Sequence, residues 1–500
     1  MSVIGLDLGT SRVKAVRFDS TWRAVDTEAE TTIVQRSPAG ECEQDMAAVW
    51  AAAARVIHAV AARSPDGVDL LALTAQGDGC WLVDAHGEPL RPAILWNDNR
   101  GSAIIDQWDR DGRLEQAFRI NGCWGAPGLA HAQLRWLDHH QPHTLSGASR
   151  LLSCGSWIYQ QLTGRQVLEV SDAANPFLAA RTRTYDPTLL DLFELVQYRR
   201  LLPELVSGPD RVAPLLGHRA YDLGLPVGTP VALAPYDVVA TALGTGTLHA
   251  GEAFAVLGTT LCVGMMAADP ALNRTPNGMT LPGPTTDSWL LAYATLNGTE
   301  VLNWTAATLG LADVTELLSL AATAQPGGQP LMLPYLSPAG ERSPFRDSTA
   351  QGSLHGLTSR HSRADIARAA LDALTLAVRA CLEAAGRPQG LALAGGGARS
   401  ELWSQAISDA TGLPVTGPDT PEVGARGAVL TAAVDADMIN SLDDAAAVAI
   451  RPGRTYTPNR DETERFSMLY HNFQAVHALS TRYSLGTEPR RSRSPLTNWG

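Results

Sequence analysis

A glycine-centred hairpin pattern occurs twice in this chain, once at the head of each half, and no other feature constrains the fold as strongly. Gly9-Thr10-Ser11 lies between two apolar runs, residues 3–8 and residues 13–18. Gly258-Thr259-Thr260 lies between equivalent runs half a chain further on. Two strands joined by a tight polar turn are expected in both places. Their equivalent positions predict a duplicated domain.

The segments between the hairpins alternate between strand and helix patterns. Short apolar runs predict strands at residues 70–73, 230–234 and 390–394. Apolar residues recur at helical spacing over residues 46–61 and 364–384, and Ser362 or Asp365 is suited to cap the second helix. Strands that alternate with such helices predict the α/β class.

The length and the duplication together predict two domains. The chain has 500 residues, which exceeds the size at which single cores stop growing. We expect an N-terminal domain over residues 1–245 and a C-terminal domain over residues 246–486. Residues 487–500 carry Arg, Ser and Pro without an apolar pattern and are expected to form a loose tail.

Composition excludes several classes of protein. The formal net charge is −12, which argues against nucleic acid or an anionic membrane as the main partner, because both attract clustered Lys and Arg. The 6 cysteines form no Cys-x-x-Cys pair, so neither a zinc ribbon nor a disulfide scaffold is expected. The first residues run directly into a predicted strand, without a basic and then apolar leader. A cytoplasmic protein is therefore expected.

The two polar turns are candidate phosphate cradles. Small residues let backbone N–H groups approach phosphate oxygens, and the hydroxyls add donors. Asp7 precedes the first turn and is placed to hold a magnesium-bound water, while Lys14 follows it and can offset phosphate charge. The alternative is an ordinary β-hairpin with a glycine turn. Two matched turns favour the cradle.

A third glycine-rich segment, Gly395-Gly396-Gly397-Ala398, follows the predicted strand 390–394 and precedes a helix expected over residues 401–411. Strand, glycine turn and helix can seat a nucleotide over the N-terminus of the helix. No Gly-Lys-Ser/Thr follows, so this is not a Walker loop. A tight connection without a ligand is the alternative interpretation.

Polar residues follow three of the predicted strands. Asp237 comes after the strand 230–234 and opens a helical pattern, so it faces the ligand side of an α/β sheet; as an alternative it only caps that helix. Gln76-Gly77-Asp78-Gly79 and Trp96-Asn97-Asp98 also follow apolar runs. Carboxylates, amides and one aromatic wall suit a polyhydroxylated ligand, although Gly, Asn and Asp are also ordinary turn residues.

Longer motifs resemble the FGGY family of carbohydrate kinases over residues 3–450. The family's C-terminal signature is matched by residues 352–357 and, seven positions later, by residues 365–372. The opening residues 5–11 are also similar to the family. So are Gly395-Gly396-Gly397-Ala398-Arg399-Ser400 with Trp403, and Ala425-Arg426-Gly427-Ala428.

The resemblance implies an α/β fold of two duplicated actin/hexokinase/Hsp70-like (ribonuclease H-like) domains with an inter-domain cleft. It implies sugar binding mainly by the first domain and ATP binding mainly by the second, with Mg²⁺ as the cation. Asp237 falls where the family has its catalytic aspartate, which also lies near the metal. Sugar contacts are implied at Gln76, Gly77, Asp78, Trp96, Asn97, Asp98 and Asp237. The phosphate-binding candidates are Thr10, Ser11, Lys14, Gly258, Thr259, Thr260, Gly396, Gly397, Ala398 and Ser400. The expected partner is a small-molecule sugar or polyol, and the expected oligomer is a homodimer.

Two departures from the family bear on the substrate. Gln133 stands where the N-terminal signature has Lys, and Ala130 where it has Pro, Ser or Thr. Gly77-Asp78 replaces the Met-His of D-xylulose kinases and the Arg-Glu of glycerol kinases, and looks more like L-xylulose (3-keto-type) and erythritol kinases. We expect Asp78 to accept hydrogen bonds from sugar hydroxyls, and Gly77 to leave space for a substituent of the substrate.

The expected activity is therefore phosphoryl transfer from MgATP to a primary hydroxyl of a pentulose or a short polyol, L-xylulose- or erythritol-like. D-xylulose is the alternative acceptor. A non-catalytic actin-like ATPase scaffold is the alternative from another class, but it would not need Asp237 or the polar clusters. A dinucleotide-dependent oxidoreductase is excluded because Gly9-Thr10-Ser11-Arg12 lacks the Gly-x-Gly-x-x-Gly pattern.

Overall fold

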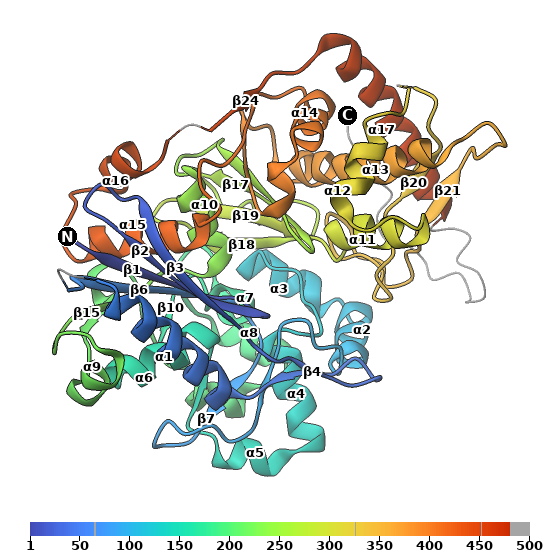
Figure 1. The fold of residues 1–500 in the computed structure, drawn as a ribbon. Coiled ribbons are helices and arrows are strands. Elements are labelled where there is room, and N and C mark those ends of the chain that lie inside the picture. Colours follow the sequence, from blue (N-terminus) through green and yellow to red (C-terminus); the bar gives the residue numbers. More distant parts are fainter. Residues whose placement is uncertain (65–66, 326, 452, 481–500) are drawn as a thin grey trace. The chain divides into compact units, whose positions relative to one another are not determined.

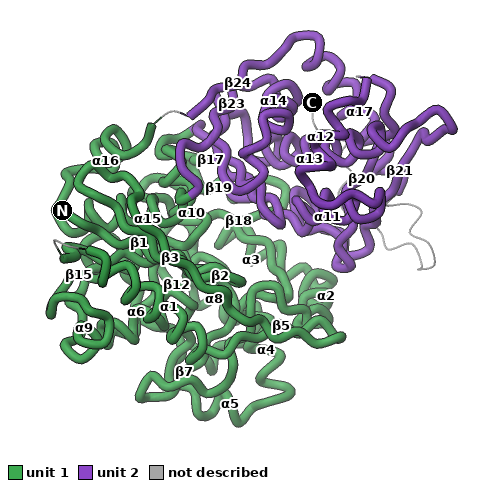
Figure 2. The backbone as a smooth tube through the Cα atoms, in the orientation of Figure 1, with its two compact units in different colours: residues 1–250, 266–291, 422–451 green, residues 251–265, 292–421, 452–500 purple. Residues whose placement is uncertain are grey.

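The computed structural model describes residues 1–64, 67–325, 327–451 and 453–480. The chain forms two compact units (Figure 2). Unit 1 contains residues 1–250, 266–291 and 422–451, and unit 2 contains residues 251–265, 292–421 and 452–500. The assignment of sugar binding to residues 1–245 and of ATP binding to residues 246–486 stays a prediction. The expected loose tail, residues 487–500, lies outside the described residues.

Unit 1 is built on a six-stranded sheet with the order β14-β15-β6-β1-β2-β3 (Figure 1). Its strands are β1 (Val3–Leu8), β2 (Arg12–Phe18), β3 (Ala24–Thr31), β6 (Leu70–Ala75), β14 (Val212–Pro214) and β15 (Pro230–Leu233). β1 runs antiparallel to β2 and parallel to β6, which in turn runs parallel to β15. The hairpin and the strands expected at its side are thus confirmed.

Both faces of this sheet are covered by helices, which explains why its central strands are apolar throughout. On one face, α1 (Met46–Ala62) shares a core with Ile4, Leu6 and Leu8. On the other face, α15 (Val423–Asp435) shares a core with Val3 and Val16. The helix expected over residues 46–61 is confirmed, with Asp45 as its N-cap.

Glycines allow α15 to lie unusually close to α10 (Asp237–Thr245). A Cβ atom at Gly427 would lie 1.8 Å from the carbonyl oxygen of Ala240, and one at Gly244 would lie 1.8 Å from that of Val423. Any larger residue at either position would force the two helices apart. The Ala425-Arg426-Gly427-Ala428 motif is therefore explained by packing.

The rest of unit 1 consists of short helices and strands around the sheet. The helices are α2 (Ser102–Arg110), α3 (Arg113–Asn121), α4 (Ala130–His140), α5 (Pro142–Gly147), α6 (Cys154–Thr163), α7 (Ala174–Phe177), α8 (Pro187–Leu192), α9 (Gly217–Leu223) and α16 (Leu442–Ala449), with 3₁₀ turns at Val196–Leu201 and Gly208–Arg211. The strands are β4 (Gln35–Arg36), β5 (Cys42–Gln44), β7 (Trp81–Val83), β8 (Ala93–Ile94), β9 (Arg150–Leu152), β10 (Val167–Glu169), β11 (Leu178–Ala179), β12 (Thr184–Tyr185), β13 (Glu204–Val206) and β18 (Met279–Pro282).

The second sheet has the strand order β18-β19-β17-β16-β22-β23-β24, and most of its strands belong to unit 2. Their bounds are β16 (Ala253–Leu257), β17 (Leu261–Ala267), β19 (Trp289–Ala294), β22 (Leu391–Ala394), β23 (Val415–Thr416) and β24 (Thr455–Tyr456). β16 runs antiparallel to β17 and parallel to β22. This repeats the relation of β1 to β2 and β6, as the duplicated hairpin predicts.

The helices of unit 2 and a separate pair of strands pack beside this sheet. They are α11 (Thr299–Thr308), α12 (Val314–Ala321), α13 (Arg363–Ala385), α14 (Glu401–Thr411) and α17 (Arg460–Ser480), with β20 (Leu331–Leu333), β21 (Ser353–His355) and a 3₁₀ turn at Gly396–Arg399. α13 begins with a capping box in which Ser362 and Asp365 each bond the backbone N–H of the other. Both expected caps are therefore used. Among the described residues, no helix has the length and apolar character needed to cross a membrane.

Candidate active site

Asp237 is the first residue of α10, directly after β15 and the turn Ala234-Pro235-Tyr236. The turn is fixed from two sides. Thr74 Oγ1 donates to the carbonyl oxygen of Pro235 at 2.7 Å, and the backbone N–H of Tyr236 donates to Ser171 Oγ at 3.0 Å. Tyr236 occupies the N-cap position, so Asp237 does not have the simple capping role that the sequence left open.

A group of carboxylates surrounds Asp237. Burial raises the pKa of Asp237 well above its ordinary value, and the charges of Asp7, Asp172 and Asp78 raise it further, while the backbone N–H of Val238 lowers it. The pKa of Asp7 is also raised, first by burial, with Lys14 opposing the shift. Like charges held this close favour one shared proton or a bound cation.

Asp172 was not among the residues predicted from the sequence. Burial raises its pKa to about 7, a shift that Asp78 and Glu169 reinforce and that hydrogen bonds from the Ser153 side chain and the Asp78 backbone oppose. Asp172 comes three residues after β10 (Val167–Glu169). Its position after a strand is the same signal that identified Asp78 and Asp237, but β10 is too short to recognise from its pattern.

The turn Gly9-Thr10-Ser11 is connected by side chains to the predicted sugar-binding residues. Thr10 Oγ1 donates to Gln76 Oε1 at 2.7 Å and accepts from Trp96 Nε1 at 2.9 Å. The carbonyl oxygen of Thr10 accepts from Gln44 Nε2 at 2.7 Å. The structure therefore brings Thr10, Gln76 and Trp96 together, while Ser11 is exposed.

Lys14 is engaged by a residue that the sequence did not connect with it. Its Nζ lies 2.6 Å from Glu422 Oε2, across 408 positions of sequence. Glu422 directly precedes α15, and a Cβ atom at Gly424 would lie 3.0 Å from Asp7 Oδ2. The N-terminus of α15 thus lies against Asp7 and completes this end of the site.

The space beside Gly77 is filled by protein. A Cβ atom at Gly77 would lie 2.1 Å from Cε2 of Tyr236 and 2.8 Å from Asp172 Oδ1. The expectation that Gly77 leaves room for a substrate substituent is therefore wrong, because the Tyr236 ring occupies that room. The neighbouring Asp78 has φ 58° and accepts from Asn175 Nδ2 at 3.3 Å.

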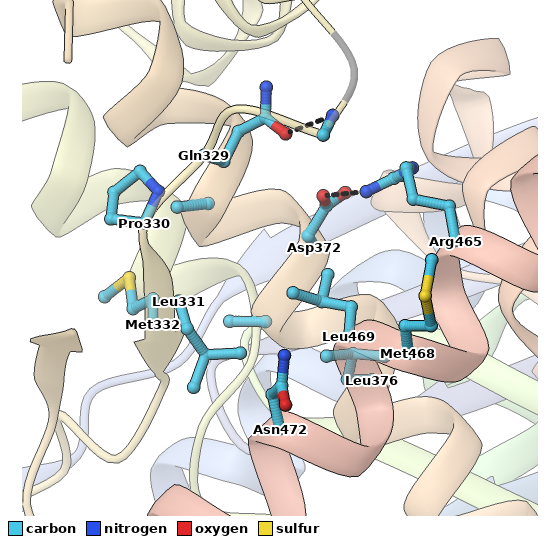
Figure 3. Close-up of a pocket in the computed structure, with 13 residues that line it drawn as sticks. Gln329, Pro330, Leu331, Met332, Asp372, Leu376, Arg465, Met468, Leu469 and Asn472 are labelled. Atoms are coloured by element: carbon cyan, nitrogen blue, oxygen red, sulfur yellow. Dashed lines mark hydrogen bonds and ion pairs between the residues drawn. The ribbon is translucent and has the colours of Figure 1, made fainter. Parts of the chain in front are cut away.

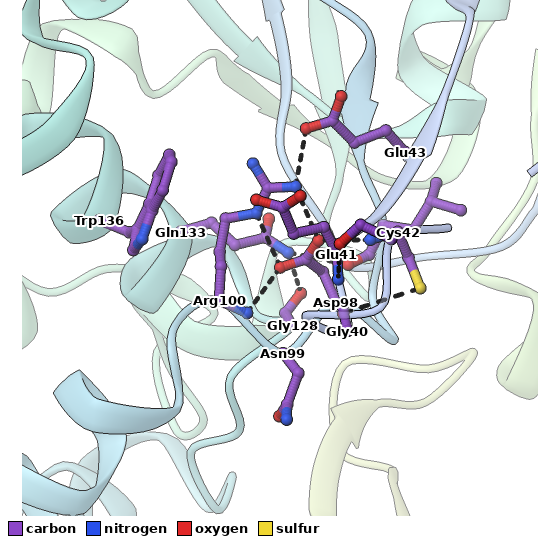
Figure 4. A network of polar contacts seen from close by, with 12 residues as sticks. Gly40, Glu41, Cys42, Glu43, Asp98, Asn99, Arg100, Gly128, Gln133 and Trp136 are labelled. Atoms are coloured by element: carbon purple, nitrogen blue, oxygen red, sulfur yellow. Dashed lines mark hydrogen bonds and ion pairs between the residues drawn. The ribbon is translucent and has the colours of Figure 1, made fainter. Parts of the chain in front are cut away.

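Asp98 belongs to a buried ion-pair network (Figure 4). Its Oδ2 accepts from the backbone N–H of Cys42 at 2.6 Å, and its Oδ1 lies 2.8 Å from Arg100 Nε. Arg100 also pairs with Glu43 at 2.7 Å. These contacts hold the loop that carries Trp96. A direct sugar contact by Asp98 stays a prediction.

Gln133, the departure from the family signature, supports the same loop (Figure 4). It is fully buried, and its Nε2 donates to the carbonyl oxygens of Leu95 at 2.8 Å and of Gly128 at 2.9 Å. A Cβ atom at Gly128 would lie 1.7 Å from the carbonyl oxygen of Trp96. Asn97, the next residue of the loop, has an enclosed Oδ1 without a hydrogen-bond partner among the described residues.

In unit 2, the turn Gly258-Thr259-Thr260 is enclosed by backbone rather than by charged side chains. Gly258 accepts from the backbone N–H of Thr299 at 2.9 Å. A Cβ atom at Gly298 would lie 2.6 Å from the carbonyl oxygen of Thr259 and 2.7 Å from that of Gly258. The Thr259 side chain is exposed.

Gly395, Gly396 and Gly397, which follow β22, differ in how much space surrounds the position of a Cβ atom. Gly395 has φ 85°, and a Cβ atom there would lie 2.8 Å from the carbonyl oxygen of Leu257. A Cβ atom at Gly397 would lie 2.4 Å from the ring of Trp403. At Gly396, nothing lies within 4 Å of such an atom. Protein packing therefore requires two of the three, and Gly396 is free to face a ligand.

The remaining two residues of this segment have structural contacts. Ala398 is buried. Ser400 is the N-cap of α14, and its Oγ accepts from the backbone N–H of Trp403 at 3.2 Å. Their contacts with phosphate stay predictions.

The C-terminal signature has a structural explanation. A Cβ atom at Gly352 would lie 2.4 Å from Leu336, and Asp365 completes the capping box of α13. Asp372 pairs with Arg368 at 2.7 Å and with Arg465 at 3.3 Å, at the edge of a cavity of about 260 Å³ between β20, α13 and α17 (Figure 3). None of the predicted site residues lines this cavity.

Comparisons with known proteins agree with this architecture. The N-terminal domain of the FGGY family of carbohydrate kinases matches residues 2–244, and its C-terminal domain matches residues 253–436. Erythritol kinase of Brucella abortus is 31% identical over 490 residues, which cover 94% of each chain. Xylulose kinase of Escherichia coli is 31% identical over 452 residues, which cover 88% of this chain and 91% of that one.

Solved structures give the same result. A xylulose kinase from Brucella ovis superposes with a TM-score of 0.87 at 28% identity, over 95% of this chain and 98% of that one. The xylulose kinase of Rhodospirillum rubrum has a TM-score of 0.87 at 26% identity, over 97% of this chain and 100% of that one. The two-domain, actin/hexokinase-like fold expected from the sequence is confirmed. The chain belongs to the FGGY family of carbohydrate kinases, enzymes that transfer phosphate to a hydroxyl of a sugar or polyol.

Proposed function

We propose that this kinase transfers the γ-phosphoryl group of MgATP to a primary hydroxyl of a pentulose or a short polyol, with Asp237 as the general base. The observation that carries the proposal is the position of Asp237 at the start of α10, among Asp7, Asp78 and Asp172. A base works best when its pKa lies near the operating pH. Burial and like charges raise the pKa of Asp237 in that direction.

The acceptor hydroxyl loses its proton to Asp237 as its oxygen attacks the γ-phosphorus; the bond between that phosphorus and the β–γ bridging oxygen breaks, and ADP leaves. Most of the acceleration in such transfers comes from positioning and from electrostatic stabilisation. The backbone of Asp237 is held by Thr74 and Ser171 through the turn before it. These contacts support a fixed direction of the carboxylate toward the acceptor.

The carboxylates also fit a divalent cation. The charge of Asp7 raises the pKa of Asp237, and a bound cation would offset this repulsion. Among the described residues, no group of three or more His, Cys, Asp or Glu side chains is arranged to hold a metal. Mg²⁺ is commonly held by one or two carboxylates, water and substrate phosphates. Asp7, through water, and Asp237 would hold it, and it would supply positive charge at the phosphates.

The phosphates of ATP are assigned to the two polar turns and to Gly396. Thr259 is exposed and Gly396 has open space where a side chain would stand. Both features support close approach of a ligand. Lys14 is paired with Glu422, so we assign it to the charge balance around Asp7 rather than to direct contact with phosphate.

The acceptor is assigned from Gly77, Asp78 and their neighbours. Similarity to both an erythritol kinase and a xylulose kinase supports a short sugar or polyol as the acceptor. Gly77-Asp78 favours L-xylulose or erythritol over D-xylulose. The six cysteines are all free, which supports the cytoplasmic location expected from the sequence. A homodimer stays a prediction.

A coupled assay of ADP release with a panel of acceptors tests the proposal. The panel contains glycerol, erythritol, L-xylulose, D-xylulose, sorbitol and gluconate, each with MgATP, and Asp237→Asn serves as the inactive reference. We expect erythritol or L-xylulose to give the highest kcat/KM. A highest value with D-xylulose would show the acceptor assignment to be wrong. Rates equal to that of Asp237→Asn for every acceptor would contradict the proposed reaction.

A further inference from the structure

We infer that Tyr236 is a specificity-determining residue: its ring, seated on Gly77, forms a wall of the acceptor site and limits the size of the acceptor. The inference rests on the proposed function, since it takes Asp237 as the residue that meets the acceptor hydroxyl. It adds to the proposed polar contact at Asp78 a limit on the volume of the acceptor that can bind.

The first observation is the contact between the ring and Gly77. A Cβ atom at Gly77 would lie 2.1 Å from Cε2 and 2.3 Å from Cδ2 of Tyr236. No side chain other than hydrogen fits at position 77 while the ring stays in place, since real Cβ atoms do not approach other atoms this closely. Gly77 and Tyr236 therefore form a packed pair, in which position 77 must be glycine because the Tyr236 ring covers it.

The second observation is the surroundings of the ring. Tyr236 directly precedes Asp237, and Gly77 directly precedes Asp78. The position that a Gly77 Cβ would take is also 2.8 Å from Asp172 Oδ1. The ring and Asp172 thus meet at Gly77, and the charges of Asp172 and Asp78 both raise the pKa of Asp237. An acceptor held by both Asp78 and Asp237 would lie beside this ring.

The third observation is that hydrogen bonds hold the backbone at Pro235 and Tyr236 in place. Thr74 holds the carbonyl oxygen of Pro235, and Ser171 holds the backbone N–H of Tyr236. Ser171 Oγ donates to Glu169, which is buried and paired with Arg211 at 3.2 Å. Because the backbone is fixed on both sides, the ring cannot withdraw by a shift of the turn. A fixed wall excludes large acceptors more effectively than a mobile side chain does.

An aromatic wall also suits the expected ligand. One face of an extended polyol presents C–H groups, which pack on a ring, while its hydroxyls turn toward the carboxylates. A short acceptor fits between the ring and Asp78. A longer or branched acceptor requires the volume that the ring occupies.

The decisive variant is Tyr236→Ala, with Tyr236→Phe to keep the ring and Tyr221→Ala as the matched control. Tyr221 lies in the same unit, on α9, and is 90% exposed. The kcat/KM values are measured for erythritol, both xyluloses and sorbitol, and acceptor Kd values are measured by calorimetry without nucleotide. We expect Tyr236→Ala to raise the sorbitol-to-erythritol ratio about tenfold or more, a change of ~1.4 kcal/mol. Tyr236→Phe and Tyr221→Ala should keep the wild-type ratio.

A second set of variants tests the contact with Gly77 independently of activity. Gly77→Ala should lower the melting temperature of the protein, and it should lower it less in a Tyr236→Gly background, because only the contact with Asp172 then remains. The Gly77→Met, Asp78→His exchange toward the D-xylulose-type pair should likewise succeed only together with Tyr236→Gly. A smaller loss of melting temperature in the variants that also carry Tyr236→Gly supports direct packing of the Tyr236 ring on Gly77.

Three results would overturn the inference. One is an acceptor ratio, in rates and in Kd, that stays within twofold when Tyr236→Ala is made. Another is a loss of all acceptors by the same factor, which would mean that the ring only supports the fold. The third is a Gly77→Ala protein as stable as wild type. Failure of the proposed function differs from all three, because the wild type itself would then release no ADP with any acceptor.

Discussion

The two hairpin turns have the same backbone plan and opposite surroundings. Gly9-Thr10-Ser11 is tied by side chains to Gln76 and Trp96 and lies at the end of the strand that carries Asp7. Gly258-Thr259-Thr260 is bordered by Gly298, and Leu257, the residue before it, is bordered by Gly395 and Gly397. The first turn is surrounded by charged and hydrogen-bonding side chains. The second turn is surrounded by backbone atoms and by glycines, which have no side chain.

The difference indicates that a duplicated hairpin fixes where a ligand can approach, while its neighbours decide which chemistry is possible. Carboxylates can accept a proton and hold a cation. A backbone-lined turn offers N–H donors and close access to a ligand, but no carboxylate that could take a proton. We therefore propose that the chemical step takes place beside the first turn and that the second turn serves mainly to hold the nucleotide. Variants that change one turn at a time test this difference.

The largest effect is expected for Asp237→Asn. It should lower kcat by ~10²–10⁴ because the amide cannot accept the hydroxyl proton, while the KM for ATP stays nearly unchanged. Asp45→Asn is the control, since Asp45 is a genuine N-cap whose side chain accepts from the backbone N–H of Ala48. Steady-state kinetics decide the matter. Activity of Asp237→Asn within a few-fold of wild type would assign Asp237 a structural role only.

Asp78→Ala tests the acceptor side of the first turn. We expect a loss of ~2–4 kcal/mol in kcat/KM for the preferred acceptor, because acceptor hydroxyls are left without a partner. ATP hydrolysis without acceptor should change little. Asp191→Ala, at an exposed position of α8, is the control. Equal kinetics of Asp78→Ala and wild type for every acceptor would remove Asp78 from the site.

Gly258→Val tests the second turn, and Gly396→Val tests the glycine segment that follows β22. A side chain at Gly396 has open space, and a Cβ atom at Gly258 meets only the carbonyl oxygen of Thr260, at 3.3 Å, and Val256, at 3.8 Å. Both variants should fold, and both should raise the KM for ATP about tenfold or more, or ~1.4 kcal/mol. Gly217→Val is the control, because nothing lies within 4 Å of its Cβ either. A rise in the acceptor KM alone would reverse the assignment of the two domains.

Much of the fold was predictable because its signals are local. The two hairpins follow from apolar alternation around a glycine turn, and α13 follows from helical spacing and its capping box. Asp237 was identified because it follows a recognisable strand. Each of these signals lies within about twenty consecutive residues, where secondary-structure periods are visible.

The contacts that complete the site were not predictable, because they join distant segments. Lys14 meets Glu422 across 408 positions. Asp172 follows a strand of three residues, and Tyr236 reaches Gly77 from another strand end. A glycine in the sequence does not reveal whether a ligand or a neighbouring side chain fills the space above it. The expected opening at Gly77 was wrong for this reason.

Thr10→Val and Thr259→Val compare the two turns directly. Thr10→Val removes the hydroxyl that pairs with Gln76 and Trp96, so it should lower the free energy of unfolding by ~1–3 kcal/mol. Thr259 is exposed, so Thr259→Val should leave stability unchanged and raise only the KM for ATP. Chemical denaturation and kinetics measure both. Equal stability losses in the two variants would mean that the turns have equivalent surroundings.

The smallest effect concerns the pH dependence of stability, which should be set by the carboxylates beside the first turn. The pKa of Asp172 is raised from 3.8 to about 7, chiefly by burial and then by Asp78 and Glu169. Between these two values the folded state binds more protons than the unfolded state. Stability is therefore lost as the pH rises through this window and changes no further above it.

Asp172→Asn removes this titration while keeping an oxygen that can accept from Ser153 and from the Asp78 backbone. Measured without ligands, its melting temperature should match or fall below that of wild type at pH 5 and exceed it by about 1–3 °C at pH 8. Asp191→Asn, an exposed site on α8, should follow wild type at both values. Parallel curves for Asp172→Asn and wild type would mean that Asp172 ionises as freely in the folded chain as in the unfolded one. The carboxylates would then impose no strain, and the contrast between a charged first turn and a neutral second turn would have no energetic basis at this residue.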